Sequence, residues 1–292
     1  MKPAPFEYVA ARSLDEALAA LADAGDGGKV LAGGQSLVPL LALRLARPDV
    51  VVDVNPIGGL DRVVVEDHHL RIGALARHRA VELDERVRRA FPLVSTAAAK
   101  IGHVAIRNRG TVGGSVAHAD PAAEWPALLL ALDGEVEVAS LRGRRVVAAE
   151  DLYAGYLTTS LEVDEMVCEV RGSLPEGRTG TSFVELARRE GDFAIVGVAA
   201  VLALEGGEVR QCRLALSGVG STPVRARAAE ELVVSSTVDE VALAAAARAV
   251  ADEIDPSGDI HGSADYRRKV AGVLVRRALV AARDEAGRTV TR

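Results

Sequence analysis

The stretch AGGQSL, residues 32–37, stands between a run typical of a strand and a run typical of a helix. KVLAGG (29–34) predicts a strand that enters a tight Gly-Gly turn. SLVPLLALRLA (36–46) predicts an apolar helix, with Pro39 in its first turn, where proline is tolerated. AGGQSL is therefore expected at a strand-to-helix junction.

The flanking residues continue this alternation. FEYVA (6–10) predicts a strand, and SLDEALAALADAG (13–25) predicts a helix with Ser13 as its N-cap. RPDVVVDVNPIGGL (47–60) predicts a buried strand that ends in a turn. Residues 1–60 are therefore expected to form a β-α-β-α-β unit.

Residues 61–174 form a second expected unit, in which strands flank helical segments. The Gly-rich stretch VAIRNRGTVGGSVAHADP (104–121) is expected to be mostly irregular, and AAEWPALLLALDG (122–134) to be a short helix. The remaining expected elements are a hairpin at 61–76, helical material at 79–101, a hairpin at 135–140 and 144–152, and a strand at 165–174.

The stretch SLPEGRTGTS (173–182) is rich in Pro, Gly, Ser and Thr and marks the expected domain boundary. Residues 178–292 then contain strand-like runs followed by helix-like runs, which predicts an α+β domain with a three-stranded sheet plus helices. The expected strands are 181–189, 194–209 and 210–220, and the expected helices are 225–233, 238–254 and 263–287.

Composition excludes several classes of protein. The net charge is −6 and there is no basic run, which argues against nucleic acid or an anionic membrane surface as a partner. Cys168 and Cys212 are far apart, so no disulfide framework, zinc site or iron–sulfur cluster is expected in this chain. The N-terminus lacks an apolar signal core, and the longest apolar run (194–204) is too short to span a bilayer. We expect a cytoplasmic protein with no membrane insertion.

AGGQSL and a second stretch, TVGGSVAHADPAAE (111–124), both combine two glycines with hydroxyl side chains. A chain that turns at glycine can direct several N–H groups at one point, which favours an anion, and glycine lets a phosphate approach closely. Neither stretch matches the phosphate-loop pattern, and no convincing GxGxxG is present. As a pair, the two stretches are interpreted as gripping one long ligand with a diphosphate, such as FAD.

The second stretch also allows two other kinds of site. Ser115, His118 and Asp120 could serve a hydrolase, and His118, Asp120 and Glu124 could bind a metal ion. Both are less favoured, because the members of a triad are brought together by the fold rather than by one short loop, and no G-x-S-x-G elbow is present. The doublet at 68–69, His-His, is expected to be a solvated hairpin turn.

Six stretches carry a more specific pattern. They are AGGQSL (32–37), DVNPIGGL (53–60), IGHVAIRNRGTVGGSVAHADPAAEWPALLLAL (101–132), YLTTSLEVDEMV (156–167), FVELARREGDFAIVGVAAVL (183–202) and GSADYR (262–267). In this order they resemble the FAD-binding, medium subunits of the molybdenum hydroxylases, the family of carbon monoxide dehydrogenase and xanthine dehydrogenase. The resemblance implies an α+β fold: a two-subdomain FAD-binding unit of the vanillyl-alcohol oxidase type, residues 1–60 and 61–174, then a smaller α+β domain, residues 178–292.

The resemblance also implies a site for non-covalent FAD, with no catalytic side chain and no metal ligand. The Gly-Gly segments would hold the diphosphate and adjoining sugar oxygens, while Leu161 and residues 188–192 would approach the adenine and flavin. Related chains often have His in place of Gln35 and Asn in place of Ser115, and a lysine near 183–186, where this chain reads FVEL. The implied cofactor-binding residues are Ala32, Gly33, Gly34, Gln35, Ser36, Leu37, Thr111, Gly113, Gly114, Ser115, His118, Asp120, Glu124, Leu161 and Asp192.

In function, the resemblance implies an oxidoreductase subunit that passes electrons from two [2Fe–2S] clusters, through FAD, to an external acceptor. The clusters would lie on a small partner subunit and molybdopterin on a large one, in a heterotrimer that can dimerise. Two alternatives stay open: a free-standing FAD-dependent oxidase or reductase of the same fold, and a scaffold that no longer binds FAD. The sequence specifies neither the substrate nor the final electron acceptor.

Overall fold

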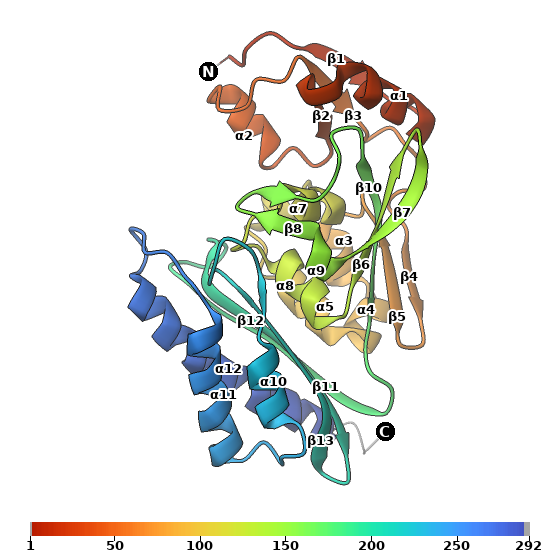
Figure 1. Cartoon of the computed structure of the whole chain (residues 1–292). Coiled ribbons are helices and arrows are strands. Elements are labelled where there is room, and N and C mark those ends of the chain that lie inside the picture. Colours follow the sequence, from red (N-terminus) through yellow and green to blue (C-terminus); the bar gives the residue numbers. More distant parts are fainter. Residues whose placement is uncertain (1, 289–292) are drawn as a thin grey trace.

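Three β-sheets, each with its own helices, follow one another along the molecule from the N-terminal end to the C-terminal domain (Figure 1). The computed structural model describes residues 2–288. A small fourth sheet pairs β8 (Tyr153–Gly155) with β9 (Thr158–Thr159). Helices and strands alternate in the first part and segregate in the last, which confirms the predicted α+β class.

The first sheet is parallel, with the strand order β1-β3-β2. It confirms the predicted β-α-β-α-β unit, and the Ser13 hydroxyl caps the first helix by accepting a hydrogen bond from the Glu16 N–H at 3.2 Å. The second helix ends earlier than expected, because the chain turns at Arg44 with a φ of 58°. The elements are β1 (Glu7–Ala10), α1 (Leu14–Ala24), a 3₁₀ turn (Gly25–Gly27), β2 (Gly28–Leu31), α2 (Leu37–Ala42) and β3 (Val50–Asp53).

The middle sheet is antiparallel, with the strand order β4-β5-β10-β6-β7, and both predicted hairpins are present. Its strands are β4 (Val63–Glu66), β5 (His69–Gly73), β6 (Glu135–Ser140), β7 (Gly143–Ala148) and β10 (Met166–Ser173). Its helices are α3 (His78–Leu83), α4 (Glu85–Ala90), α5 (Pro92–Ala98), α6 (Val104–Arg107), α7 (Val112–His118), α8 (Glu124–Ala131) and α9 (Ala149–Leu152).

The prediction that residues 104–121 are mostly irregular is wrong, because α6 and α7 lie within them. Thr111 is the N-cap of α7, and its hydroxyl accepts a hydrogen bond from the Gly114 N–H at 3.2 Å. A Cβ on Gly113 would lie 2.5 Å from the Ala74 Cβ. Glycine at 113 therefore permits close packing of a helix against the chain that leaves β5, rather than a turn.

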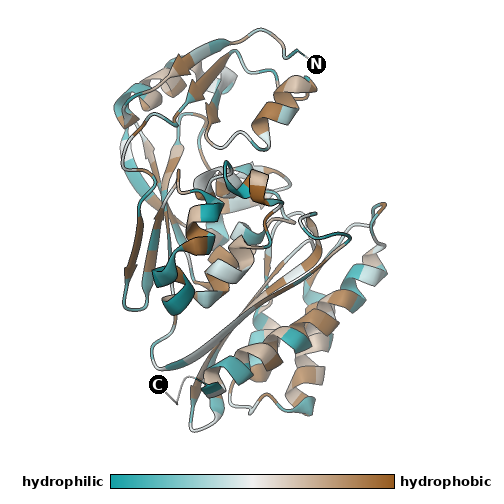
Figure 2. Ribbon diagram, turned by 180° about the vertical axis from the view of Figure 1, so that it is seen from behind, coloured by the Kyte–Doolittle hydropathy of each residue, from teal (hydrophilic) through white to brown (hydrophobic). Residues whose placement is uncertain are grey.

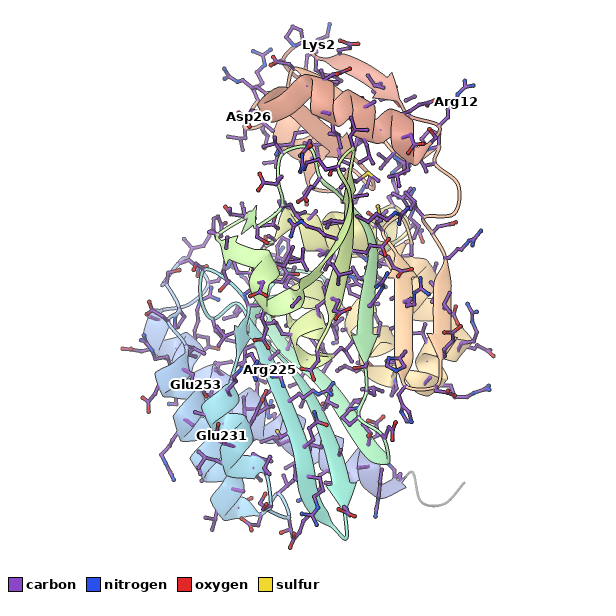
Figure 3. The ribbon with its side chains drawn as sticks, turned by 45° about the vertical axis from the view of Figure 1, so that its right-hand side comes forward. Lys2, Arg12, Asp26, Arg225, Glu231 and Glu253 are labelled. Atoms are coloured by element: carbon purple, nitrogen blue, oxygen red, sulfur yellow. The ribbon has the colours of Figure 1, made fainter. Side chains whose placement is uncertain are left out.

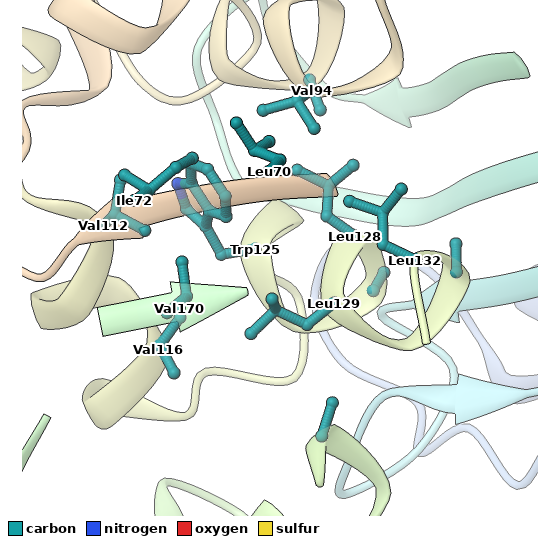
Figure 4. Close-up of a cluster of buried hydrophobic side chains, with 14 of the residues drawn as sticks. Leu70, Ile72, Val94, Val112, Val116, Trp125, Leu128, Leu129, Leu132 and Val170 are labelled. Atoms are coloured by element: carbon teal, nitrogen blue, oxygen red, sulfur yellow. The ribbon is translucent and has the colours of Figure 1, made fainter. Parts of the chain in front are cut away.

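The buried face of α7 anchors this helix to the middle sheet. Figure 4 shows Val112 and Val116 of α7 in a cluster with Ile72 of β5, Val170 of β10 and Trp125 of α8. Trp125 is 1% exposed, as expected for a core residue. Its indole N–H donates to Nδ1 of buried His78 at 3.1 Å, and burial, with the charges of two nearby arginines, lowers the pKa of His78 to about 4. His78 is therefore a neutral acceptor that holds Trp125 in place.

The C-terminal sheet has four strands rather than the predicted three, in the order β11-β12-β13-β14. The extra strand has only two residues, too few to give a periodic pattern in the sequence. Figure 2 shows brown and teal residues mixed along the helices that cover the sheet, as expected for helices with one buried face. The elements are β11 (Arg178–Ala187), β12 (Ala194–Glu205), β13 (Glu208–Ser217), β14 (Val224–Arg225), α10 (Arg227–Val233), α11 (Glu240–Glu253) and α12 (Ala264–Arg288).

This sheet is buried on both faces, which explains the unbroken apolar run in β12. Ala199 and Val201 face the core shared with α5 and α8, whereas Val198 and Ala200 face the core shared with α10–α12. Hydrogen bonds of a charged side chain also join the C-terminal sheet to the end of α8 in the middle part of the chain. Arg225, labelled in Figure 3, donates to the Leu130 carbonyl and to the Asp133 carboxylate, both at 2.7 Å.

Both cysteines are buried strand residues, Cys168 on β10 and Cys212 on β13. Between residues 2 and 288, no helix is both long enough and apolar enough to cross a membrane. The His68–His69 doublet is exposed at the β4–β5 turn.

Candidate functional site

A cavity of about 390 Å³ opens at the carboxyl ends of β2 and β3. Ligands of open sheets with parallel strands commonly bind at this edge. Residues 32–35 of the first Gly-Gly segment and Arg109, just before the second segment, both line it. The lining residues are Leu31, Ala32, Gly33, Gly34, Gln35, Val38, Pro39, Asp53, Asn55 and Arg109.

The first segment presents a run of unused backbone donors. Gly34 has a φ of 71°, and α2 begins three residues later at Leu37. Within residues 2–288, the N–H groups of residues 33–37 have no hydrogen-bond acceptor. Five consecutive free amides beside a cavity are suited to an anionic group with several oxygens, because each amide can donate one hydrogen bond to it.

The two Gly-Gly segments, far apart in sequence, are in direct contact. A Cβ on Gly33 would lie 2.4 Å from the Arg109 carbonyl oxygen and 2.7 Å from the Gly110 Cα. A Cβ on Gly114 would lie 3.8 Å from the Ala32 Cβ. The structure therefore brings the predicted pair of segments together, and Gly33 is required for the close approach.

The second segment differs from the expected nest of free amides. The N–H of Val112 donates to the Ala76 carbonyl, that of Gly113 to Ala74, and those of Gly114 and Ser115 to the hydroxyl and carbonyl of Thr111. The prediction of an amide nest in this segment is wrong, since a helix N-terminus docked on β5 already uses these donors. Half-buried Gly114 and the Ser115 hydroxyl remain available to a ligand.

A chain of hydrogen bonds fixes the two segments to each other. The Arg77 guanidinium donates to the Arg109 carbonyl and, at 2.7 Å, to Oδ1 of Asn55. Nδ2 of Asn55 donates to the Ala32 carbonyl at 2.8 Å. Asp53 accepts from Asn55 N–H at 2.9 Å and from the Tyr8 hydroxyl at 2.6 Å. These bonds lower the pKa of the Asp53 carboxyl against the opposing effect of burial, so Asp53 stays ionised.

Leu161 and residues 188–192, which the resemblance also assigns to the cofactor, are not among the residues that line the cavity. A Cβ on Gly191 would lie 2.6 Å from Nδ1 of His103, so residues 188–192 pack beside the start of α6. Asp192 is exposed there, and Leu161 packs against the core under α7.

Comparison with known proteins decides the family. Residues 4–175 match the model of the FAD-binding domain in molybdopterin dehydrogenase, and residues 181–282 match that of the CO dehydrogenase flavoprotein C-terminal domain. The chain belongs to the FAD-binding medium subunits of the molybdenum hydroxylases. It is therefore a subunit of an oxidoreductase.

Individual relatives match this medium subunit over nearly its whole length. The 6-hydroxypseudooxynicotine dehydrogenase complex subunit alpha of Paenarthrobacter nicotinovorans is 44% identical, with 97% of this chain and 96% of the relative covered. The caffeine dehydrogenase subunit beta of Pseudomonas sp. (strain CBB1) is 39% identical, with 97% of each chain covered. A solved carbon monoxide dehydrogenase from Hydrogenophaga pseudoflava, which lacks the Mo-pyranopterin moiety, superposes with a TM-score of 0.95, 38% identity and coverage of 98% and 99%.

The lining of this cavity in the medium subunit suits an anionic group with several oxygens. The free amides of residues 33–35 supply donors, and Arg109, which lines the same cavity, supplies positive charge. The glycines were predicted from the sequence, whereas Asp53, Asn55 and Arg77 were not among the predicted site residues. The available signal was the position of Asp53 and Asn55 directly at the end of a buried strand, where parallel-sheet ligands bind.

The other predicted residues of the medium subunit take separate places. His118 is the last residue of α7, and Asp120 accepts a hydrogen bond from the Ala122 N–H at 2.9 Å. In the described part of the chain no hydrogen bond joins Ser115, His118 and Asp120, so the structure gives no support to a hydrolytic triad. Nor does any group of three or more His, Cys, Asp or Glu side chains among residues 2–288 suit a metal ion.

Glu124 of the medium subunit is only 4% exposed, and it lies near another acid, Glu185 of β11. Burial, reinforced by Glu185 and Asp120, raises the pKa of Glu124 to about 8. Burial also raises the pKa of Glu185 to about 7, and one of its carboxylate oxygens is buried without a hydrogen-bond partner in the described residues. FVEL therefore places one acid, Glu185, near a second acid, Glu124.

Substitution of Gly33 by Ala should separate the two Gly-Gly segments, because the new Cβ cannot occupy a point 2.4 Å from the Arg109 carbonyl. We expect the free energy of unfolding to fall by about 1–3 kcal/mol and FAD affinity to fall at least about tenfold. Urea unfolding and fluorescence titration with FAD measure both. Gly58→Ala is the matched control, since a Cβ at Gly58 meets nothing within 4 Å. A Gly33→Ala protein with wild-type affinity would show that this contact does not shape the site.

Substitution of Glu124 by Gln should stabilise the folded chain at alkaline pH. The folded pKa of about 8 exceeds the usual 4.5, so the contribution of Glu124 is fully present below pH 4.5 and lost as the pH rises through 8. Glutamine mimics the protonated acid and avoids this loss, which amounts to at most about 5 kcal/mol. Unfolding free energies measured across this range should converge at acidic pH and diverge above it. Equal curves for Glu124→Gln and the exposed control Glu231→Gln would contradict the assignment.

Proposed function

We propose that this medium subunit binds FAD non-covalently and relays electrons from a [2Fe–2S] partner subunit to an external acceptor. FAD, when bound, supplies the chemistry of accepting electrons singly and releasing them as a pair. The observation that carries the proposal is a cavity lined both by residues 33–35, whose amides have no acceptor in the described residues, and by Arg109. This arrangement favours a polyanionic group, such as the diphosphate of FAD.

The residues of the chain bind and orient the cofactor rather than take part in bond breaking. The first segment would donate backbone hydrogen bonds, while Arg77 and Asn55 link it to the backbone of Arg109. More distant parts of the same ligand are proposed to contact half-buried Gly114 and Ser115 of α7, and Asp192 beside α6. The remaining predicted contacts, including His118, Asp120 and Leu161, are proposed on the family resemblance alone.

The proposed partners rest on the family resemblance and on the names of the relatives, and the cysteine content of the chain agrees with them. A [2Fe–2S] cluster takes four ligands, and the whole chain has two cysteines, Cys168 and Cys212, each buried in a different sheet. Two relatives are named as subunits of dehydrogenases, one of them explicitly of a complex. We therefore propose a heterotrimer with a small iron–sulfur subunit and a large molybdopterin subunit, in which the large subunit determines the substrate.

An absorption spectrum of the purified chain tests the cofactor assignment. We expect flavin absorption bands, with the flavin released as free FAD when the protein is denatured. A colourless chain that takes up no added FAD would contradict the proposal. Addition of the reduced iron–sulfur partner should then bleach the flavin bands. If the chain alone is reduced directly by an organic substrate, the free-standing oxidase or reductase is the correct function instead.

A further inference from the structure

Two arginines precede the second Gly-Gly segment, and the structure gives them different roles. Arg107 is buried, pairs with Glu82 at 2.8 Å and donates to the carbonyls of Ile101 and Gly102. Arg109 is exposed and lines the cavity, and within residues 2–288 its guanidinium has no hydrogen-bond or ion-pair partner. Arg107 therefore stabilises the fold around α6, whereas no partner in the described residues balances the charge of Arg109.

The backbone of Arg109 is held although its side chain is not. Its carbonyl accepts a hydrogen bond from Arg77 and lies directly against Gly33. Arg77 is bound in turn to Asn55, which donates to the Ala32 carbonyl. The Arg109 backbone, from which the side chain extends, is thus held at a fixed position relative to the free amides of residues 33–37.

The charges around Arg109 make a nearby anion favourable. The guanidiniums of Arg77 and Arg109 repel each other, and this repulsion adds to burial in lowering the pKa of Arg77. The acids that act on Arg77 are Asp53 and Asp61, and the Asp53 carboxylate already accepts hydrogen bonds from Tyr8 and Asn55. An anion between Arg109 and the free amides would relieve the repulsion as well as add new contacts.

We propose that the Arg109 guanidinium is the counter-charge of the FAD diphosphate and that Arg77 is the positioning residue that holds its backbone. This inference rests on the proposed function and deepens it. The amides of residues 33–37 recognise the shape of the diphosphate, and Arg109 contributes the charge. FAD affinity should accordingly depend on salt, because counter-ions screen a partly exposed cation.

Arg109→Gln removes this charge, and Arg109→Lys keeps it without the planar guanidinium. We expect Arg109→Gln to raise the Kd for FAD by about 10- to 100-fold, and Arg109→Lys to retain most of the affinity. The increase in Kd with added salt should be smaller in Arg109→Gln than in the wild type. Arg248→Gln, on α11, is the matched control, because it removes an exposed arginine far from the cavity and should change nothing.

The stability of the FAD-free chain separates a binding role from a structural one. Since Arg109 repels Arg77 and has no partner, Arg109→Gln should leave the thermal unfolding midpoint of the FAD-free chain unchanged or raised. A lowered midpoint, a wild-type Kd or an unchanged salt dependence would each overturn the inference. If the wild type itself binds no FAD, the proposed function fails and this inference fails with it. If the wild type binds FAD and Arg109→Gln binds it equally well, only this inference fails.

Discussion

The contact between Gly33 and the Arg109 carbonyl is the constraint on which the proposed site depends. It joins the carboxyl edge of the first sheet to the start of α7, across about eighty residues of sequence. Any side chain at 33 would occupy the position of that carbonyl. Arg77 and Asn55 reinforce the contact with hydrogen bonds to the same two segments.

The two Gly-Gly segments use glycine for different physical reasons. At Gly34 a positive φ turns the chain and leaves the neighbouring amides free. At Gly113 the absence of a Cβ lets α7 pack on Ala74, and the apolar residues Val112 and Val116 fix the helix to the core. One segment therefore supplies donors, and the other supplies a rigid surface that holds Arg109 in position.

Local patterns predicted most of the fold. The β-α-β-α-β unit, the hairpins and the long helices of the last domain all follow from periodicity and capping, as Ser13 illustrates. α7 was missed because Gly-Gly has a low helix propensity, and only tertiary packing on Ala74 favours a helix there. β14 was missed because two residues show no period. The glycines of the site were identified, but Arg77 and Asn55 act through contacts between distant segments, which one sequence does not reveal.

Amide hydrogen exchange, with and without FAD, tests the central claim most directly. The claim is that residues 33–37 provide the free donors of the site, while α7 uses its first-turn donors internally. We predict fast exchange at residues 33–37 in the FAD-free chain and strong protection when FAD binds, with little change at residues 112–115. Residues 33–37 that exchange equally fast in both states, while 112–115 become protected on binding, would contradict this account.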